Sequence, residues 1–207
     1  MFRRLTFLCS ITLALAASSA RAQVNYDTVQ VRSIQLARGV YMLTGSGGNM
    51  GLSVGTDAAF VVDDQFAPLT PKVLAAIKAI TPDPVKFVLN THWHFDHTGG
   101  NEAFGPEATI IAHENVRKRM EKGQSLKGEQ IAPAPPKALP VITFGESLSV
   151  NFNGEEIRIL HYPHGHTDGD SVIFFTGSNV VHMGDDYFAG RFPTPSTFRA
   201  VPRPGSP

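Results

Sequence analysis

The stretch His92-Trp93-His94-Phe95-Asp96-His97 concentrates three imidazoles and one carboxylate in six consecutive residues. It comes just after residues 85–90, an apolar and β-branched run that predicts a buried strand. The polar side chains therefore lie where a strand ends and a loop begins, so they can converge instead of alternating across a sheet. Neutral imidazole and carboxylate are the ligands that zinc and similar divalent ions prefer. The stretch predicts a metal site; imidazoles crowded together for purely structural reasons would repel one another whenever they are protonated.

Two later strand ends offer further ligands. Residues 156–162 alternate like a strand, and the break after them contains Gly165-His166-Thr167. Residues 171–176 and 179–183 are apolar runs, and the second of them ends at Gly184-Asp185. A glycine directly before a ligand lets the backbone approach a crowded centre. His166 and Asp185 are therefore the further candidates.

These three motifs, H-x-H-x-D-H, G-H-T with a downstream acidic residue, and G-D after an apolar strand, occur in this order. Together they resemble the metallo-β-lactamase superfamily of metal-dependent hydrolases, over about residues 31–188. The resemblance implies an α/β fold of the αββα sandwich type. Periodicity alone leaves other α/β architectures open.

The resemblance also implies a ligand set. Carried over residue by residue, the first metal would be held by His92, His94 and His166, and the second by Asp96 and His97, with Asp185 bridging the two. The family places its last ligand, a histidine, in a loop near the C-terminus, but no histidine follows His182 in this sequence. We therefore expect one or two Zn²⁺ ions per chain and a weakened second site. The aspartate at position 185 is more similar to thioesterases, lactonases and other carboxylate-bridged members than to cysteine-ligand lactamases.

A metal ion held by three neutral imidazoles lowers the pKa of a bound water and polarises a carbonyl. The expected function is a zinc-dependent hydrolase that uses a metal-bound hydroxide on a small-molecule carbonyl substrate: a β-lactam, lactone, ester or thioester. Asp96 is the catalytic candidate, orienting the hydroxide and passing a proton to the leaving group. The alternative is a catalytically weak or inactive truncated fragment that binds metal. A zinc-sequestering protein is a third interpretation, but binding alone does not call for Asp96.

The remaining polar candidates carry weaker predictions. His182 lies inside an apolar strand and is expected to fill a core position. His113 is expected to end a strand or open the helix that follows it. His161 and His164 flank the G-H-T motif and are expected at the surface by default. Asp63, which ends the apolar run 59–62, resembles the buried aspartate that supports the metal loop in this family.

Residues 1–22 read as a secretory signal peptide. Arg3 and Arg4 precede a mostly apolar stretch, which ends at an Ala-x-Ala cleavage site at 20–22. We therefore expect a periplasmic or secreted protein, with no membrane anchor after cleavage because the apolar stretch is too short to span. Cys9, the single cysteine, lies within this signal, so the mature chain would have no disulfide or zinc–thiolate chemistry.

Removal of the signal leaves 15 Lys and Arg against 18 Asp and Glu, a net charge of −3, which does not favour a nucleic-acid partner. Residues 23–192 suit one hydrolase domain, with a proline-rich surface excursion at 122–140. Residues 193–207 contain five prolines and predict a disordered tail. Because family members continue further, we expect a C-terminally truncated chain whose second half is incomplete; the alternative is a short homologue with a natural disordered tail. The oligomeric state is left open.

Two local predictions complete the picture. Residues 40–43 and 51–54 are expected to pair as a hairpin around the glycine-rich turn 45–49. Thr70 and Pro71 predict a helix start, with Thr70 as the N-cap.

Overall fold

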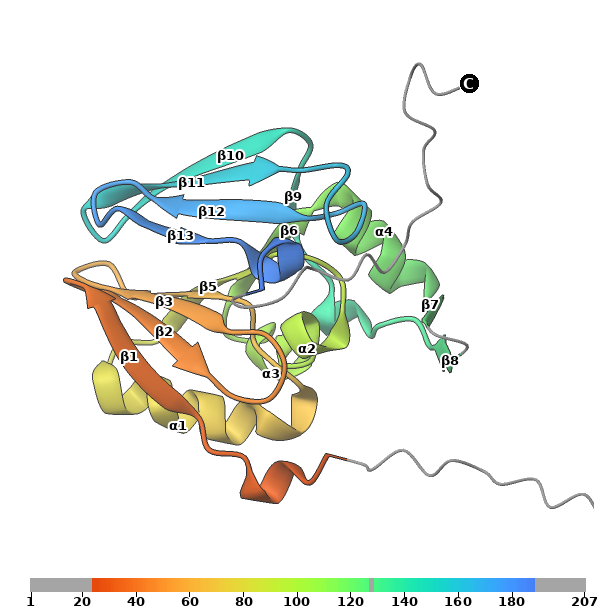
Figure 1. Cartoon of the computed structure of the whole chain (residues 1–207), viewed down its shortest axis with the longest axis horizontal. Helices are drawn as coiled ribbons and strands as arrows, with labels where there is room; N and C mark the ends of the chain where they lie inside the picture. Colours follow the sequence, from red (N-terminus) through yellow and green to blue (C-terminus); the bar gives the residue numbers. More distant parts are fainter. Residues whose placement is uncertain (1–23, 127–128, 189–207) are drawn as a thin grey trace, which may run out of the picture.

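Two β-sheets lie face to face in the computed structural model, which describes residues 24–126 and 129–188 (Figure 1). The first sheet has the strand order β1-β2-β3-β4-β5-β6-β9, and the second has the order β10-β11-β12-β13. The strands of the first sheet are β1 (Arg32–Ala37), β2 (Val40–Thr44), β3 (Met50–Val54), β4 (Ala59–Val62), β5 (Val85–Asn90), β6 (Thr109–His113) and β9 (Ile142–Phe144). Those of the second sheet are β10 (Ser147–Phe152), β11 (Glu155–His161), β12 (Ser171–Phe175) and β13 (Val180–His182). The predicted signal peptide and the predicted tail at 193–207 lie outside the described residues.

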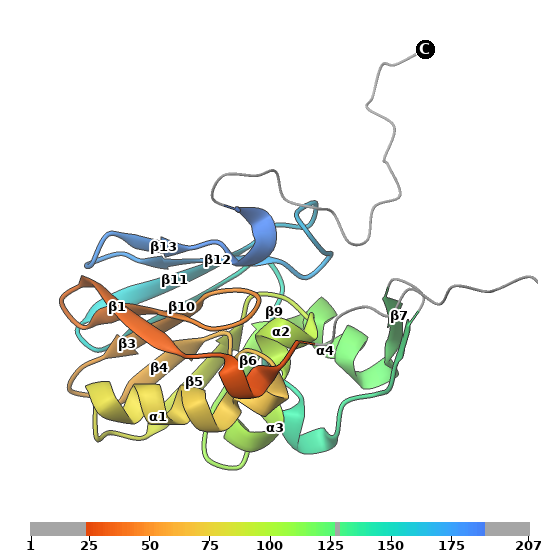
Figure 2. The ribbon, with the colours of Figure 1, turned by 60° about the horizontal axis from the view of Figure 1, so that its bottom comes forward.

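Helices cover one side of this pair of sheets. Helix α1 (Thr70–Ile80) runs along the outer face of the first sheet, as Figures 1 and 2 show from two directions. The short helices α2 (Phe95–Thr98) and α3 (Asn101–Phe104) lie on the same side, and α4 (Glu114–Lys122) follows β6. In the ranges that the structure describes, no helix lies over the outer face of the second sheet. The predicted α/β class is confirmed, with three layers described in the order helix, sheet, sheet.

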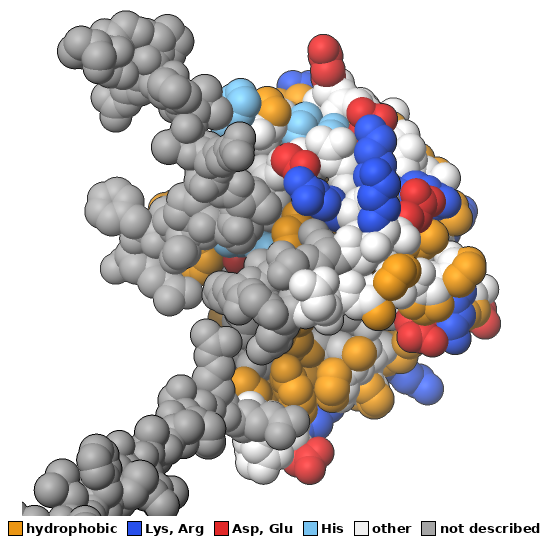
Figure 3. Space-filling view, turned by 90° about the vertical axis from the view of Figure 1, so that its right-hand side faces the viewer, with side chains coloured by type: hydrophobic (Ala, Val, Ile, Leu, Met, Phe, Trp, Pro, Cys, Tyr) orange, Lys and Arg blue, Asp and Glu red, His pale blue; other side chains and the backbone are white. Residues whose placement is uncertain are grey.

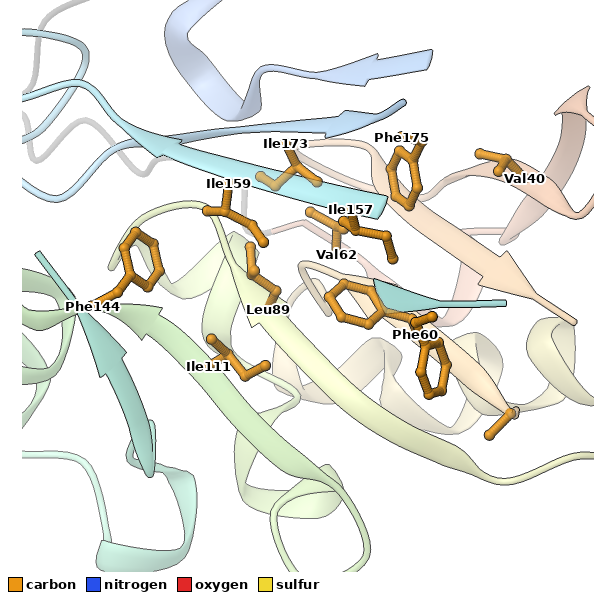
Figure 4. Packing of buried hydrophobic residues seen from close by; sticks show 12 residues of the cluster. Val40, Phe60, Val62, Leu89, Ile111, Phe144, Ile157, Ile159, Ile173 and Phe175 are labelled. Carbon is orange, nitrogen blue, oxygen red and sulfur yellow. The ribbon is translucent and has the colours of Figure 1, made fainter. Parts of the chain in front are cut away.

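The apolar pattern of each strand reflects how many of its faces are covered. All four residues of β4 are buried, because Phe60 and Val62 face the second sheet while Ala59 and Val61 face α1. Strand β11 alternates instead: Ile157 and Ile159 are buried against the first sheet, and Arg158 is exposed. Figure 4 shows the cluster between the sheets, which includes Phe60, Val62, Leu89, Ile111, Ile157, Ile159, Ile173 and Phe175. Burial of this apolar surface holds the sheets together.

Local predictions are met in part. The hairpin is confirmed, since β2 and β3 pair antiparallel with Leu43 opposite Met50. The helix start is off by one residue: Thr70 is the first residue of α1, and a 3₁₀ turn at Ala67–Leu69 leads into it. Strands β1 and β10 were not anticipated. In β1, Ile34 and Leu36 alternate with polar residues, but five of its six residues are exposed.

The segment around 122–140 packs beside α4. It contains the pair β7 (Gln124–Leu126) and β8 (Glu129–Ile131) and a 3₁₀ turn at Pro136–Ala138. On the face that carries α4, cationic and anionic side chains lie next to one another (Figure 3). Within α4, Arg117 pairs with Glu121 at 2.7 Å. Leu139 packs with Trp93, so the segment supports the loop that follows β5.

Within the described ranges, no helix combines the length and the apolar character that crossing a bilayer requires.

Candidate metal centre

The candidate centre lies where β5 ends, on the loop that leads into α2. Strand β5 is parallel to its neighbours β4 and β6, so its carboxyl end opens at the same edge as theirs. The buried side chain of Asn90 donates to the carbonyl of His97 at 2.9 Å and to Asn101 Oδ1 at 3.1 Å. These bonds fold the loop back on the strand end. They fix the positions from which the histidines point inward.

Three imidazole nitrogens converge at this edge. His94 Nδ1 lies 2.9 Å from His92 Nε2 and 3.1 Å from His166 Nε2. All three side chains are buried, and Asp185 can offer a fourth ligand atom within 4.8 Å of these nitrogens. Neutral imidazole has one donor and one acceptor nitrogen, so His94 Nδ1 can satisfy at most one of these contacts by a hydrogen bond. Three nitrogens aimed at one point fit a cation with nitrogen ligands.

A second group lies directly beside the first. His97 Nε2 is 3.3 Å from Asp185 Oδ1 and 3.5 Å from Asp96 Oδ2. The other carboxylate oxygen of Asp185, Oδ2, lies 3.5 Å from His166 Nε2. Asp185 therefore faces both groups, one oxygen to each. The structure brings all six sequence-predicted ligands together, in two groups that share one carboxylate: His92, His94, Asp96, His97, His166 and Asp185.

Asp63 orients two of these rings from behind. Its Oδ2 accepts from His97 Nδ1 at 2.7 Å and from the Thr91 hydroxyl at 2.8 Å, while its Oδ1 accepts from the Thr91 amide at 2.7 Å. The Thr91 hydroxyl in turn lies 3.1 Å from His92 Nδ1. Bonds at Nδ1 leave Nε2 of both histidines facing the centre, the usual arrangement behind metal-binding histidines. The predicted buried position of Asp63 is confirmed.

The protonation of the rings follows from burial and from neighbouring charges. Burial, together with the nearby His97, holds the pKa of His92 well below its ordinary value. Burial and His166 lower the pKa of His94 to about 4, so both rings are neutral, which is the form that binds metal. Burial alone would lower the pKa of His97 as well, but Asp63, Asp185 and Asp96 raise it well above the ordinary value. Positive charge is thus favoured where the second group converges.

The second sheet holds His166 through two carboxylates that the sequence did not single out. Asp186 Oδ1 accepts from the His166 amide at 2.8 Å, and Asp170 accepts from the Thr167 amide at 2.5 Å and from its hydroxyl at 2.6 Å. Burial and the nearby Asp170 raise the pKa of Asp186 to about 6. Ser171 donates its amide to the Thr91 carbonyl at 2.9 Å, which ties this loop to the metal loop. The spacing of Thr167 and Asp170 was a visible signal; Asp186 had none, because its contact is made across the fold.

The other histidines do not join the two groups. The prediction that His182 fills a core position is wrong: it is half-buried, lines the cleft over the centre, and its Nε2 lies 3.1 Å from the Asn49 carbonyl. Among the described residues β13 is the last strand of its sheet, so an apolar sequence context did not guarantee burial. His113 opens α4 as predicted, accepting from the Asn115 amide at 3.2 Å. Its ring stacks on that of the half-buried His161 at 3.5 Å, and His164 is exposed as expected.

A cleft of about 770 Å³ opens over the centre. Its floor carries His94, Asp96, His166 and Asp185. Apolar and aromatic side chains supply much of the wall, among them Leu36, Met42, Phe66, Phe95, Val180 and Tyr187. Mostly apolar walls around a few convergent polar groups are typical of small-molecule sites.

The layered sheets and the paired histidine–aspartate groups define a two-sheet α/β protein with a candidate dinuclear metal centre. The family model of the metallo-beta-lactamase superfamily matches residues 43–197. The chain belongs to this superfamily, which confirms the resemblance inferred from the three motifs.

Curated relatives share part of their length with this chain. It is 29% identical over 126 residues to the 2,4-dinitroanisole O-demethylase subunit alpha of Nocardioides sp. (strain JS1661), covering 58% of this chain and 33% of the relative. It is 30% identical over 138 residues to the hydroxyacylglutathione hydrolase of Synechococcus sp. (strain JA-3-3Ab), covering 65% of this chain and 46% of the relative. The chain spans about a third to a half of the length of these relatives.

Solved structures show the same fold. The class B3 di-zinc metallo-beta-lactamase LRA-12 from an Alaskan soil metagenome superposes with a TM-score of 0.64 at 20% identity, over 75% of this chain and 60% of that one. A beta-lactamase from Chitinophaga pinensis gives a TM-score of 0.64 at 18% identity, over 76% of this chain and 62% of that one.

Proposed function

We propose that this chain is a zinc-dependent hydrolase that cleaves a small-molecule carbonyl substrate: a β-lactam, lactone, ester or thioester. The observation that carries the proposal is the pair of donor groups joined by Asp185 beneath an open cleft. Nitrogen and carboxylate donors in this number suit zinc. A zinc ion bound there would supply Lewis acidity and bring the pKa of water toward neutrality.

Each ligand has a place in this proposal. His92, His94 and His166 would hold one ion and Asp96 and His97 a second, with Asp185 shared between them. Thr91 and Asp63 contact Nδ1 of His92 and of His97, which leaves Nε2 of both rings available to hold the ions. The neutral state of His92 and His94 means that no proton has to leave these rings when they bind metal.

Asp96 is the proposed catalytic residue. It lies on the floor of the cleft, and its side chain is 22% exposed. Burial opposes its ionisation, but the hydrogen bond and charge of His97 prevail and lower its pKa, so it is a carboxylate at neutral pH. In that form it would accept a hydrogen bond from the attacking water and orient it toward the carbonyl carbon. It would take a proton from this water as the new C–O bond forms, and give the same proton to the leaving group as the bond to that group breaks.

The test is metal content measured together with turnover. The purified chain would be loaded with zinc, dialysed, analysed for bound metal, and assayed with chromogenic lactam, lactone, ester and thioester substrates. Two ions with turnover that Asp96→Asn abolishes would support the proposal. His182→Ala is the matched control, because His182 lines the same cleft outside both donor groups.

One observation favours the weaker alternative, a metal-binding fragment with little or no activity. Within the described residues, the second group has three side-chain ligands and the first has four, with Asp185 counted in both. A second ion held by fewer ligands would bind more weakly and assist the leaving group less. One bound ion or none, with turnover near the background rate, would support this alternative.

We also propose that the protein is exported, with residues 1–22 as a cleaved signal peptide and the periplasm or the exterior as its destination. The charged start, the apolar stretch and the Ala-x-Ala site support this proposal. Mass spectrometry of the periplasmic fraction should find a mature N-terminus at Gln23. Full-length protein confined to the cytoplasm would contradict it.

A further inference from the structure

Gln65 adopts a conformation that needs an explanation. It is completely buried, and its φ of 67° lies in the left-handed region that glycine favours. A non-glycine residue in this region is strained, and such strain persists only where surrounding contacts impose it. Asp63, two residues earlier, has a φ of 60°. The chain therefore turns sharply on both sides of Asp64, directly behind the metal loop.

Both ends of the Gln65 amide bind one loop. The side-chain Nε2 donates to the carbonyl of Gly48, and Oε1 accepts from the amide of Ser46 at 3.2 Å. These partners belong to the glycine-rich loop 45–49 between β2 and β3, far from Gln65 in sequence. A donor on one side and an acceptor on the other also fix which way the amide points.

This loop lies against the second donor group. A Cβ added at Gly48 would lie 2.7 Å from His97 Nε2 and closer still to Cε1 of the same ring. A Cβ added at Gly47 would lie 2.8 Å from Asp96 Oδ2. Only a residue without a side chain lets the backbone come so near. The loop therefore contacts Asp96 and His97 along its two central glycines.

We propose that Gln65 is a positioning residue for the second metal ion: it clamps the loop 45–49 onto Asp96 and His97 and so sets the affinity of that group. His97 is then held from two sides, by Asp63 at Nδ1 and by the Gly48 backbone at Cε1. A group with three side-chain ligands gains most from such preorganisation, because less ordering remains to be done when the ion binds. The inference rests on the metal binding in the proposed function and not on the identity of any substrate.

The test uses zinc alone, titrated against a competing chelator to give stepwise dissociation constants for the first and second ion. Gln65→Gly removes both amide contacts and relieves the backbone strain. Its matched control is Asn179→Gly, which relieves a similar φ of 54° at an exposed turn between β12 and β13. We expect Gln65→Gly to raise the dissociation constant of the second ion about 10-fold or more, as loss of an outer contact typically does. The first constant should change less than about 2-fold, and neither should change in Asn179→Gly.

A second variant acts from the other side of the contact. Gly48→Ala leaves Gln65 in place but pushes a methyl group toward His97. It should raise the dissociation constant of the second ion in the same way. Gly145→Ala is its control, because a Cβ there meets nothing within 4 Å. Thermal unfolding of every variant without metal would show whether each one folds.

Three results would overturn the inference. The first is unchanged dissociation constants in folded Gln65→Gly and Gly48→Ala, and the second is an equal rise in the dissociation constants of both ions. The third is a wild-type chain that binds one ion only. Failure of the proposed function gives a different result. A chain that binds two ions, shows the selective loss in both variants and hydrolyses no substrate would support the clamp and contradict the activity.

Discussion

The two sheets bury their inner faces alike but differ in what covers their outer faces. On the first sheet, outward-facing Val61 is 1% exposed because α1 packs over it. On the second sheet, Val181 is 48% exposed and lines an outer hollow of about 500 Å³ with Phe174 and Met183. The donor groups draw on both sheets, since the loop after β5 carries the first four ligands while His166 and Asp185 follow β11 and β13. Within the residues that the structure describes, the centre thus lies between a first sheet that is covered on both faces and a second sheet that is covered on one.

The largest expected effect is a loss of bound zinc on removal of one imidazole, whether that imidazole follows a strand of the first sheet or of the second. His94→Ala, in the first case, and His166→Ala, in the second, should each reduce retained zinc at the first group from about one ion to near none. The reason is that a site with three nitrogen ligands loses its geometry when one is missing. Metal analysis after dialysis measures this, with His182→Ala as the control. Equal metal content in all three variants would refute the assignment.

The next largest effect should come from Asp63, which supports the metal-binding loop after β5 from behind. Asp63→Asn keeps the size of the side chain but removes the charge that His97 and Thr91 face. We expect metal affinity to fall about 10- to 100-fold. Chelator competition measures this. An unchanged affinity would show that the loop holds His97 without Asp63.

A matched pair of substitutions tests the difference between the outer faces directly. Val61→Ala should lower the free energy of unfolding by about 2 kcal/mol, from about 0.8 kcal/mol per buried methylene plus the cavity left under α1. Val181→Ala should change it by less than about 0.5 kcal/mol, because half of that side chain is already exposed. Denaturant unfolding measures both. A large loss in Val181→Ala would show that the outer face of the second sheet is covered in solution.

The smallest effect is a pH dependence where the sheets meet, at the stacked rings of His113 on β6 and His161 on β11. Burial, then the neighbouring His161, lowers the pKa of His113 to about 4, against the opposing charge of Glu114; Lys118 adds slightly to the lowering. The unfolded chain, with an ordinary pKa near 6.5, binds this proton more readily, so stability falls as the pH drops from about 6.5 toward 4.

His113→Asn removes this titration and keeps a good N-cap for α4. In metal-free protein, its loss of stability between pH 7 and pH 5 should be smaller than that of the wild type, measured by urea unfolding at each pH. Identical pH profiles would show that His113 does not contribute.

The short-range part of the site could be predicted from sequence. His92, His94, Asp96 and His97 follow one strand end, so chain connectivity alone keeps them together. The hairpin β2–β3 was found for the same reason, because its partners are separated by one turn. Strand β1 was missed although Ile34 and Leu36 alternate with polar residues in its sequence; both side chains are exposed in the fold. His182 was misplaced because its strand is apolar but lies at the edge of its sheet in the part of the chain that the structure describes.

By itself, the sequence determined the α/β class, the superfamily and the six candidate ligands, because these depend on local patterns and on motif order. The resemblance implied how the ligands divide into two groups, but the contacts that bring them together depend on the tertiary structure, since His166 meets His94 across 72 residues of chain and Asp185 turns one oxygen to each group. The tertiary structure also decided the contacts of Gln65, Asp170 and Asp186. Hydrogen bonds between distant segments depend on how the sheets and loops pack, and that packing sums many weak contacts that no short motif records.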